Sequence, residues 1–130
     1  MRSHPKLLGM FILALLFVFL GSNLLANEET VEMRLQRVKS LGGVVVLPNG
    51  DPVVGAQVVE YSSDWHTELR RTETDSQGHF ALTPVKGRKL YYLQITARDA
   101  HNVGINPLRV PLQISRFRGK DQLVLRLKLA

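Results

Sequence analysis

The chain has 130 residues, a formal net charge of +6 and no Cys, so thiol catalysis, thiolate metal sites and disulfide frameworks are excluded. The first 26 residues contain a long apolar run and none of the acidic residues. The 104 residues that follow can bury one modest core, but not two domains or a large cofactor cleft.

The N-terminus has the pattern of an export signal. A short basic start precedes the apolar run 7–20, and the small residue Ala26 follows a polar break. We therefore predict a hydrophobic signal helix over 1–26, cleaved after Ala26. Residues 7–26 carry no charge and are about long enough to span a bilayer, so an uncleaved membrane anchor is the alternative. In either case we expect the rest of the chain outside the cytoplasm, in the periplasm or secreted.

The segment 27–40 is mixed polar and charged. Val31, Leu35 and Val38 have roughly helical spacing, which leaves a short helix as one interpretation. Because no Gly, Pro or cap bounds that helix, we predict a linker instead, with the domain itself over 41–130.

From residue 41 onward, short β-type runs alternate with turn residues, and no segment has the pattern of an amphipathic helix. Seven strands are predicted, over 41–47, 56–62, 66–74, 79–83, 89–97, 108–114 and 122–129. Such a series is typical of an antiparallel Greek-key β-sandwich, so the predicted fold class is all-β. Pro111 lacks an N–H, which predicts that its strand lies at a sheet edge. The last run has a period of two, and we expect its alternate leucines to face the core: Leu123, Leu125, Leu127 and Leu129.

Two segments carry a more specific pattern. Residues 41–58 contain L-x-G-x-V followed by G-x-P-V-x-G-A-x-V, and residues 72–82 read T-x-T-D-x-x-G-x-F-x-L. Together they resemble the carboxypeptidase regulatory-like domain, a transthyretin-like β-sandwich widespread in exported proteins. The resemblance covers about 41–129 and implies a module that lacks catalytic groups and serves a separate chain. The sequence departs from the family pattern at Leu47 and over 98–104.

The turn residues of these segments have structural interpretations. Gly50 and Gly55 stand where a hairpin and its exit need unusual φ values, and Pro52 sets the turn between them. Asp75 can accept N–H groups within its own turn, for which Gly78 supplies a positive φ. Asp75 is thus predicted to be structural rather than catalytic. The strand residues beside these turns are expected to face the core: Ala56, Val58, Phe80 and Leu82.

The sequence holds no convergent set of catalytic groups. His66, His79 and His101 lie in separate turns or strand ends without ligand spacing, so solvated histidines are favoured over a metal site. No Gly-x-Ser-x-Gly elbow or phosphate-binding Gly loop is present. We predict no enzyme activity, metal or cofactor; a hydrolase or metalloenzyme would require the three histidines to meet at one end of the sandwich.

Charge is divided unevenly along the chain. Residues 27–85 hold five basic and nine acidic side chains, whereas 86–130 hold ten basic and two acidic. The densest basic clusters are Arg116, Phe117, Arg118 and Lys120, and, separately, Lys86, Arg88 and Lys89. A basic patch can dock anionic lipid headgroups, acidic glycans or an acidic protein. Solvated charges that aid solubility are the simpler interpretation, and nucleic acid is not expected for an exported domain.

Trp65 and His66 lie in a predicted loop. The Trp65 ring can face a sugar or a protein partner, or it can fold back over the end of the sandwich, and the sequence does not separate these cases. The leading functional hypothesis is a non-enzymatic accessory or interaction module that binds an envelope protein or glycan. The alternative is a small carbohydrate- or ligand-binding module that uses the loops around Trp65 and 98–107.

Overall fold

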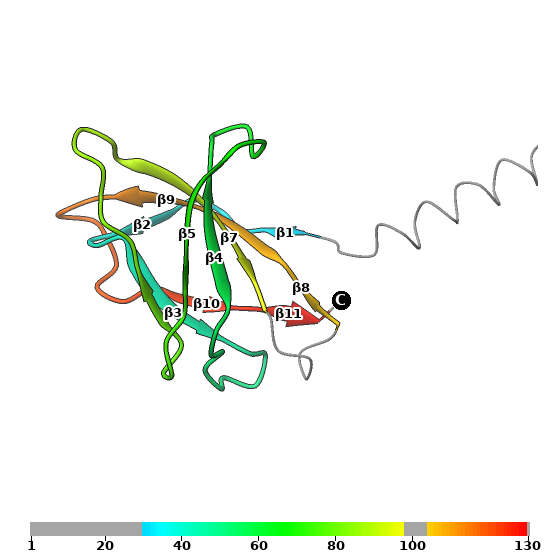
Figure 1. Ribbon diagram of the computed structural model, residues 1–130. Helices are drawn as coiled ribbons and strands as arrows, with labels where there is room; N and C mark the ends of the chain where they lie inside the picture. The colour runs from blue at the N-terminus through cyan, green and yellow to red at the C-terminus, as the bar shows by residue number, and fades with distance from the viewer. Residues whose placement is uncertain (1–29, 98–103, 130) are drawn as a thin grey trace, which may run out of the picture.

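The computed structural model describes residues 30–97 and 104–129, which fold as an all-β domain without a helix (Figure 1). The strands are β1 Val31–Glu32, β2 Gln36–Val38, β3 Gly42–Val46, β4 Gln57–Tyr61, β5 Glu68–Glu73, β6 His79–Ala81, β7 Leu90–Thr96, β8 Ile105–Asn106, β9 Leu108–Ile114, β10 Val124–Arg126 and β11 Lys128–Leu129. None of these residues belongs to a helix that could cross a membrane. The predicted leader 1–26 and most of the 98–104 loop lie outside the described residues.

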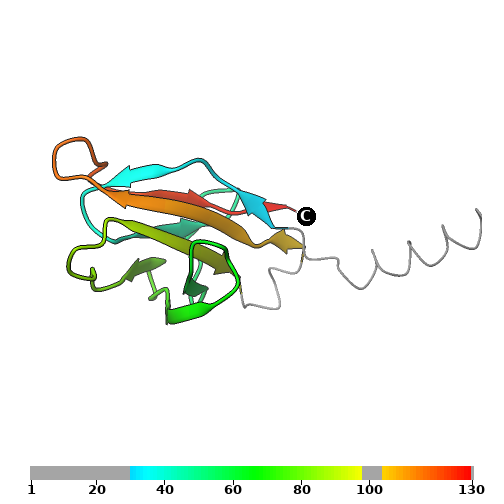
Figure 2. The same cartoon turned by 90° about the horizontal axis from the view of Figure 1, so that it is seen from above.

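The strands form two main sheets and one small pair. The larger sheet has the order β1-β9-β7-β4-β5, with β2 also paired to β9, and the second sheet has the order β10-β3-β6. β8 and β11 form the remaining antiparallel pair. In Figure 2 the long strands β7 and β9 run side by side, and the loop after β9 projects at the end opposite to Thr30. This arrangement is consistent with a β-sandwich.

The pairing is not wholly antiparallel, so that part of the prediction is wrong. β1 and β2 run parallel to β9, and β10 runs parallel to β3. β2 and β9 run toward the same end of the sandwich and finish there, and β3 and β10 both start at that end. The two strands of each pair therefore run in the same direction. Each predicted strand run contains an observed strand, and the last run is divided at Leu127 into β10 and β11. The strands that the sequence does not predict, β1, β2 and β8, have two or three residues each.

Residues 31–32 and 36–38 form strands of the larger sheet, although the sequence predicts a linker there. β2 pairs with the last residues of β9, and the N–H of Ser115 donates to the carbonyl of Val38. The Val38 side chain is buried in the core cluster. The alternation of exposed Arg37 and buried Val38 is too short to identify a strand without knowledge of its partner.

Pro111 lies inside the larger sheet, so its predicted place at an edge is wrong. β9 pairs with β7 on one side and with β1 and β2 on the other. On the second side, the N–H groups of Val31 and Met33 donate to the carbonyls of Pro107 and Arg109. Because alternate residues direct their backbone groups to the same side, the Pro111 nitrogen faces the gap between β1 and β2, where no ladder bond requires an N–H.

One apolar cluster lies between the two main sheets. Tyr91, Leu93 and Ile95 of β7 are fully buried, in alternation with less buried neighbours. The predicted inward residues Ala56, Val58 and Phe80 belong to the same cluster, and Leu82 packs against it. Leu123, Leu125 and Leu127 are buried as predicted, but Leu129 is 70% exposed because β11 pairs only with the short β8 beyond the main sheets. The hydrophobic effect of this burial is what favours the folded state.

The loops gather at two ends, which we name by their chemistry. The turn end comprises the β3–β4 connection 47–56 and the β5–β6 connection 74–78. The basic end comprises 39–41, 82–89 and 115–123, which join β2 to β3, β6 to β7 and β9 to β10. The described chain begins at Thr30 away from the basic end (Figure 1).

The turn residues of the resembling segments behave as predicted. Gly50, Gly55 and Gly78 all have positive φ, and Pro52 forms a bridge with Val46 in the β3–β4 connection. A Cβ on Gly78 would lie 2.7 Å from the Val45 carbonyl oxygen and 3.0 Å from the Pro52 Cβ, so the position also requires a missing side chain.

Asp75 has the predicted structural role at the same end. Its Oδ1 accepts the N–H groups of Gln77 and His79, each at 2.9 Å. These bonds, that from His79 first, hold the pKa of the Asp75 carboxyl below its ordinary value. The carboxylate therefore closes the turn.

Candidate binding site at the basic end

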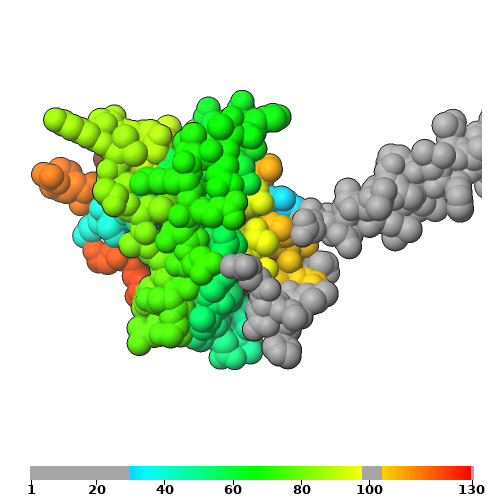
Figure 3. Space-filling model, in the orientation of Figure 1, coloured from blue at the N-terminus to red at the C-terminus, as the bar shows by residue number. Residues whose placement is uncertain are grey.

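The basic end joins charges that are far apart in the sequence. Its three loops hold seven Lys and Arg residues and one acid, Asp121. They surround a hollow of about 760 Å³, lined by Lys39, Ser40, Pro84, Gly87, Arg88, Lys89, Gln113, Ile114, Ser115, Arg116 and Phe117. In Figure 3 the 82–89 loop and the 115–118 turn project side by side on the left of the molecule. The two basic clusters of the sequence thus form one surface.

Most of these cations have no anionic partner. The side chains of Lys86, Lys89, Arg116 and Arg118 are exposed and make no ion pair or hydrogen bond with another residue in the described part of the chain. Lys39 and Arg88 are the exceptions: the Lys39 Nζ lies 2.8 Å from an Asp121 carboxylate oxygen, and Arg88 pairs with Glu60. The surface therefore has a net positive charge that is available to a ligand.

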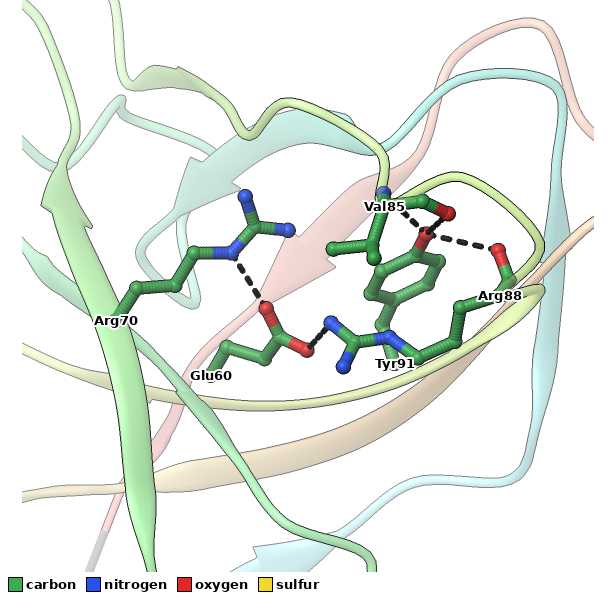
Figure 4. A network of polar contacts seen from close by, with 5 residues as sticks. All are labelled: Glu60, Arg70, Val85, Arg88 and Tyr91. Atoms are coloured by element: carbon green, nitrogen blue, oxygen red, sulfur yellow. Dashed lines mark hydrogen bonds and ion pairs between the residues drawn. The ribbon is translucent and has the colours of Figure 1, made fainter.

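Arg88 is held at this surface by a buried carboxylate (Figure 4). Glu60 is only 1% exposed, and its two oxygens accept from Arg88 Nη2 and from Arg70 Nε, the latter at 2.6 Å. Arg70 lies directly opposite Glu60 on the neighbouring strand β5. Since two arginines share one carboxylate, the group keeps a net positive charge.

Tyr91 fixes the loop that carries Arg88. Its ring lies 4.6 Å from the Arg88 Cζ, its hydroxyl accepts the Val85 N–H at 2.9 Å, and it donates to the Arg88 carbonyl at 2.8 Å. A backbone bond from Arg88 to Val85 and the positive φ of Gly87 complete the turn. The 82–89 loop is thus tied to the core, and Arg88 has a defined position before any ligand binds.

Glu60, Arg70 and Tyr91 are functional candidates that the sequence analysis does not identify. A signal was available for Glu60, since it follows Ala56 and Val58 at the same inward-facing spacing. An acid at an inward position needs a cationic partner. Which arginines supply it depends on the pairing of strands and loops, which the sequence does not reveal.

Phe117 is the most exposed large apolar side chain of the described residues, at 91%. It stands at the tip of the β9–β10 turn between Arg116 and Arg118. The turn is closed by bonds from the N–H groups of Arg118 and Gly119 to Ser115. The ring is therefore presented to solvent by an ordered turn.

Trp65 and His66 lie apart from this hollow. The Trp65 ring folds back on the outer face of the larger sheet, with its centroid 5.5 Å from that of Tyr92 and 6.2 Å from that of Tyr61. The Arg109 Cζ lies 4.9 Å from the same ring. His66 is exposed, and its Nδ1 lies 2.8 Å from the Asp64 carbonyl. The structure thus separates Trp65 and His66 from the other predicted partner-binding residues, namely Arg116, Phe117, Arg118 and Lys120.

The histidines do not form a common site within the described residues. His66 precedes β5 and His79 follows it, so the two lie toward opposite ends of that strand. His101 lies outside the described residues. No group of three His, Cys, Asp or Glu residues with metal-binding geometry occurs over 30–97 and 104–129. A site made of all three histidines is therefore not compatible with this fold.

Comparison with known proteins adds no identification. No protein-family model matches the chain, and no curated protein matches its sequence. The likeness to the carboxypeptidase regulatory-like domain remains a hypothesis based on its two sequence segments.

Proposed function

We propose that this chain is a non-enzymatic accessory module of the cell envelope that binds an acidic partner through its basic end. The observation that carries the proposal is the convergence of three loops around one hollow, where 82–89 and 115–123 place unpaired cations and the second of them also an exposed Phe. Like charges gathered on one surface repel one another, and an anionic partner relieves that repulsion.

The buried network supports this proposal over simple solubility charges. A charge that serves solubility needs no fixed position, whereas Arg88 is anchored by Glu60, Arg70 and Tyr91. A buried carboxylate is costly to desolvate and is weak support for stability. Its presence below the basic end therefore favours a role in positioning.

The finer description of the protein is part of the same proposal. We infer a transthyretin-like Greek-key sandwich, exported by the segment 1–26, that works beside a separate chain or surface. The motifs at the turn end and the basic start of the leader support this inference.

A photo-crosslinking residue tests the proposal in cells. Placed at Phe117 in the full chain, it should give a discrete adduct, because that side chain projects from the proposed surface. The matched control is the same residue at Gln77, which is exposed at the turn end. No adduct from position 117, or equal adducts from both positions, would contradict the proposal.

A second candidate function is carbohydrate binding at the outer face of the larger sheet. The observation that favours it is the half-exposed group of Trp65, Tyr61 and Tyr92, since aromatic rings bind sugars by stacking. Arg109 covers part of the Trp65 ring, which makes this the weaker candidate. Glycan-array binding that is lost in Trp65→Ala, but kept in Phe117→Ala, would support it over the basic end.

A further inference from the structure

We propose that the partner of the basic end is an anionic membrane surface, with Phe117 inserted among the lipids and the surrounding cations bound to headgroup phosphates. This inference rests on the proposed function and names the partner of the same site. Its first support is the arrangement at the tip, where an exposed aromatic ring projects between two unpaired arginines. Interfacial anchors combine an apolar side chain with basic neighbours in this way.

The distribution of apolar groups favours a membrane over a protein partner. Protein interfaces have a contiguous, well-packed apolar centre surrounded by polar groups. At the basic end the exposed apolar side chains stand on different elements: Phe117 on the β9–β10 turn, Val85, 43% exposed, in the 82–89 loop, and Leu90, 43% exposed, at the start of β7. Cations line the hollow near both loops. Isolated apolar tips among cations fit a lipid interface, which needs no shape complementarity.

The hollow can accommodate a phosphate-bearing headgroup. Lys39, Arg88, Lys89 and Arg116 lie around it, together with the hydroxyls of Ser40 and Ser115. Arginine and lysine side chains with hydroxyl donors are suited to phosphate oxygens. Arg88 is already positioned through Glu60, so part of the ordering that binding requires has taken place in the fold.

The position of the basic end leaves it free to meet a surface. The described chain starts at Thr30, and β11 carries the C-terminal residues Lys128 and Leu129 at that same end (Figure 1). The loop with Phe117 projects at the opposite end. The described chain therefore enters the fold away from the proposed surface.

Vesicle binding of the full chain tests the inference. The probes are vesicles of phosphatidylcholine alone and of phosphatidylcholine mixed with phosphatidylglycerol, and bound protein is measured by flotation. We expect tighter binding to the anionic vesicles, weakened by added salt. Arg116→Gln and Arg118→Gln should each weaken it about fivefold. Phe117→Ala should weaken it about tenfold or more, because a buried Phe side chain is lost from the lipid.

Two matched variants at the opposite end serve as controls. Lys128→Gln removes the same charge as Arg118→Gln, and Leu129→Ala removes another highly exposed apolar side chain. Neither should change the affinity for anionic vesicles. Equal loss in the control variants, or equal binding of the wild-type chain to both kinds of vesicle, would overturn the inference.

Insertion of the tip has its own measurement. Trp65 is the only Trp of the chain, so the double variant Trp65→Phe/Phe117→Trp places a single fluorophore at the tip. On anionic vesicles its emission should shift to the blue and be quenched by lipids brominated on the acyl chains. Emission that stays unshifted and unquenched while the folded variant is bound would overturn insertion. A thermal melt shows that the variant is folded.

The outcomes separate this inference from the proposed function. A protein or glycan adduct at position 117, without preference for anionic vesicles, contradicts the membrane partner and leaves the acidic-partner function standing. A lipid adduct together with selective vesicle binding supports both. No adduct and no selective binding contradict both.

Discussion

The two ends of the sandwich are held in different ways. At the turn end, backbone geometry closes the loops: Gly55 and Gly78 have positive φ, and Asp75 accepts two N–H groups within its own turn. At the basic end, side chains from distant strands hold the loops, with Glu60 and Tyr91 as the anchors. At the turn end the polar groups bond to one another, whereas at the basic end several cations have no ion-pair partner.

This difference bears on where the fold and the proposed function are encoded. The residues that resemble a known family, Gly50, Pro52, Gly55, Asp75 and Gly78, lie at the turn end and satisfy local backbone needs. None of them lines the hollow at the basic end. The resembling motifs therefore report on the fold, and the candidate site lies at the other end of the molecule.

The largest expected effect is the removal of Glu60. Glu60→Gln leaves Arg70 and Arg88 without their carboxylate, and we expect a loss of about 3 kcal/mol in the free energy of unfolding. Denaturant unfolding measures this loss. The matched control is Glu68→Gln, because Glu68 pairs with Arg71 at an exposed position, where water screens the pair and the expected loss is much smaller. Equal losses in the two variants would contradict the anchoring role of Glu60.

A single added methyl group at the turn end is expected to destabilise the fold. Gly78→Ala combines a positive φ with overlap against the Val45 carbonyl, so we expect a loss of about 2 kcal/mol in unfolding free energy. Gly55→Ala has a positive φ but nothing within 4 Å, and should lose about 1 kcal/mol. A Gly55 variant that is less stable than the Gly78 variant would contradict a contribution of the close contact at Gly78 to stability. Binding at the basic end should be unchanged in both variants.

The smallest expected effect is the pH dependence that comes from Asp75. Its pKa is lowered in the folded state, so its stabilising contribution is present above the unfolded-state value and is lost as the pH falls through the lower folded value. The difference in stability between wild type and Asp75→Asn should therefore stay constant from about pH 7 to about pH 5 and shrink as the pH falls below about 4. Unfolding midpoints at several pH values measure it. A stability difference that does not change with pH would contradict the role of the two hydrogen bonds that the Asp75 carboxylate accepts.

Local features were predictable from the sequence, and long-range ones were not. Gly50, Gly78 and Asp75 act within a few residues of themselves, and the alternation of Leu123 and Leu125 depends only on the period of a strand. The parallel pairing of β2 with β9 instead joins segments more than seventy residues apart. No local pattern encodes such a pairing, so the sequence predicts a linker over 27–40, where no Gly, Pro or cap bounds a helix.

The candidate site was predictable in its parts but not in its assembly. The clusters 86–89 and 116–120 are evident from charge alone. Their meeting at one hollow depends on how β7 and β9 pair, and the anchoring of Arg88 depends on Glu60, which is twenty-eight residues away. Trp65 is a further example. The sequence leaves open whether its ring faces a partner or folds back on the sandwich, and the fold places the ring against Tyr92.

Hydrogen exchange of the full chain compares the two ends in one measurement. It is recorded alone, with vesicles that contain phosphatidylglycerol, and with inorganic polyphosphate as a soluble polyanion. The account predicts slower exchange in 82–89 and 115–120 and unchanged exchange in 47–56 and 74–78 when an anion is bound. Slower exchange confined to 47–56 and 74–78, or no change at either end with both anions, would contradict it.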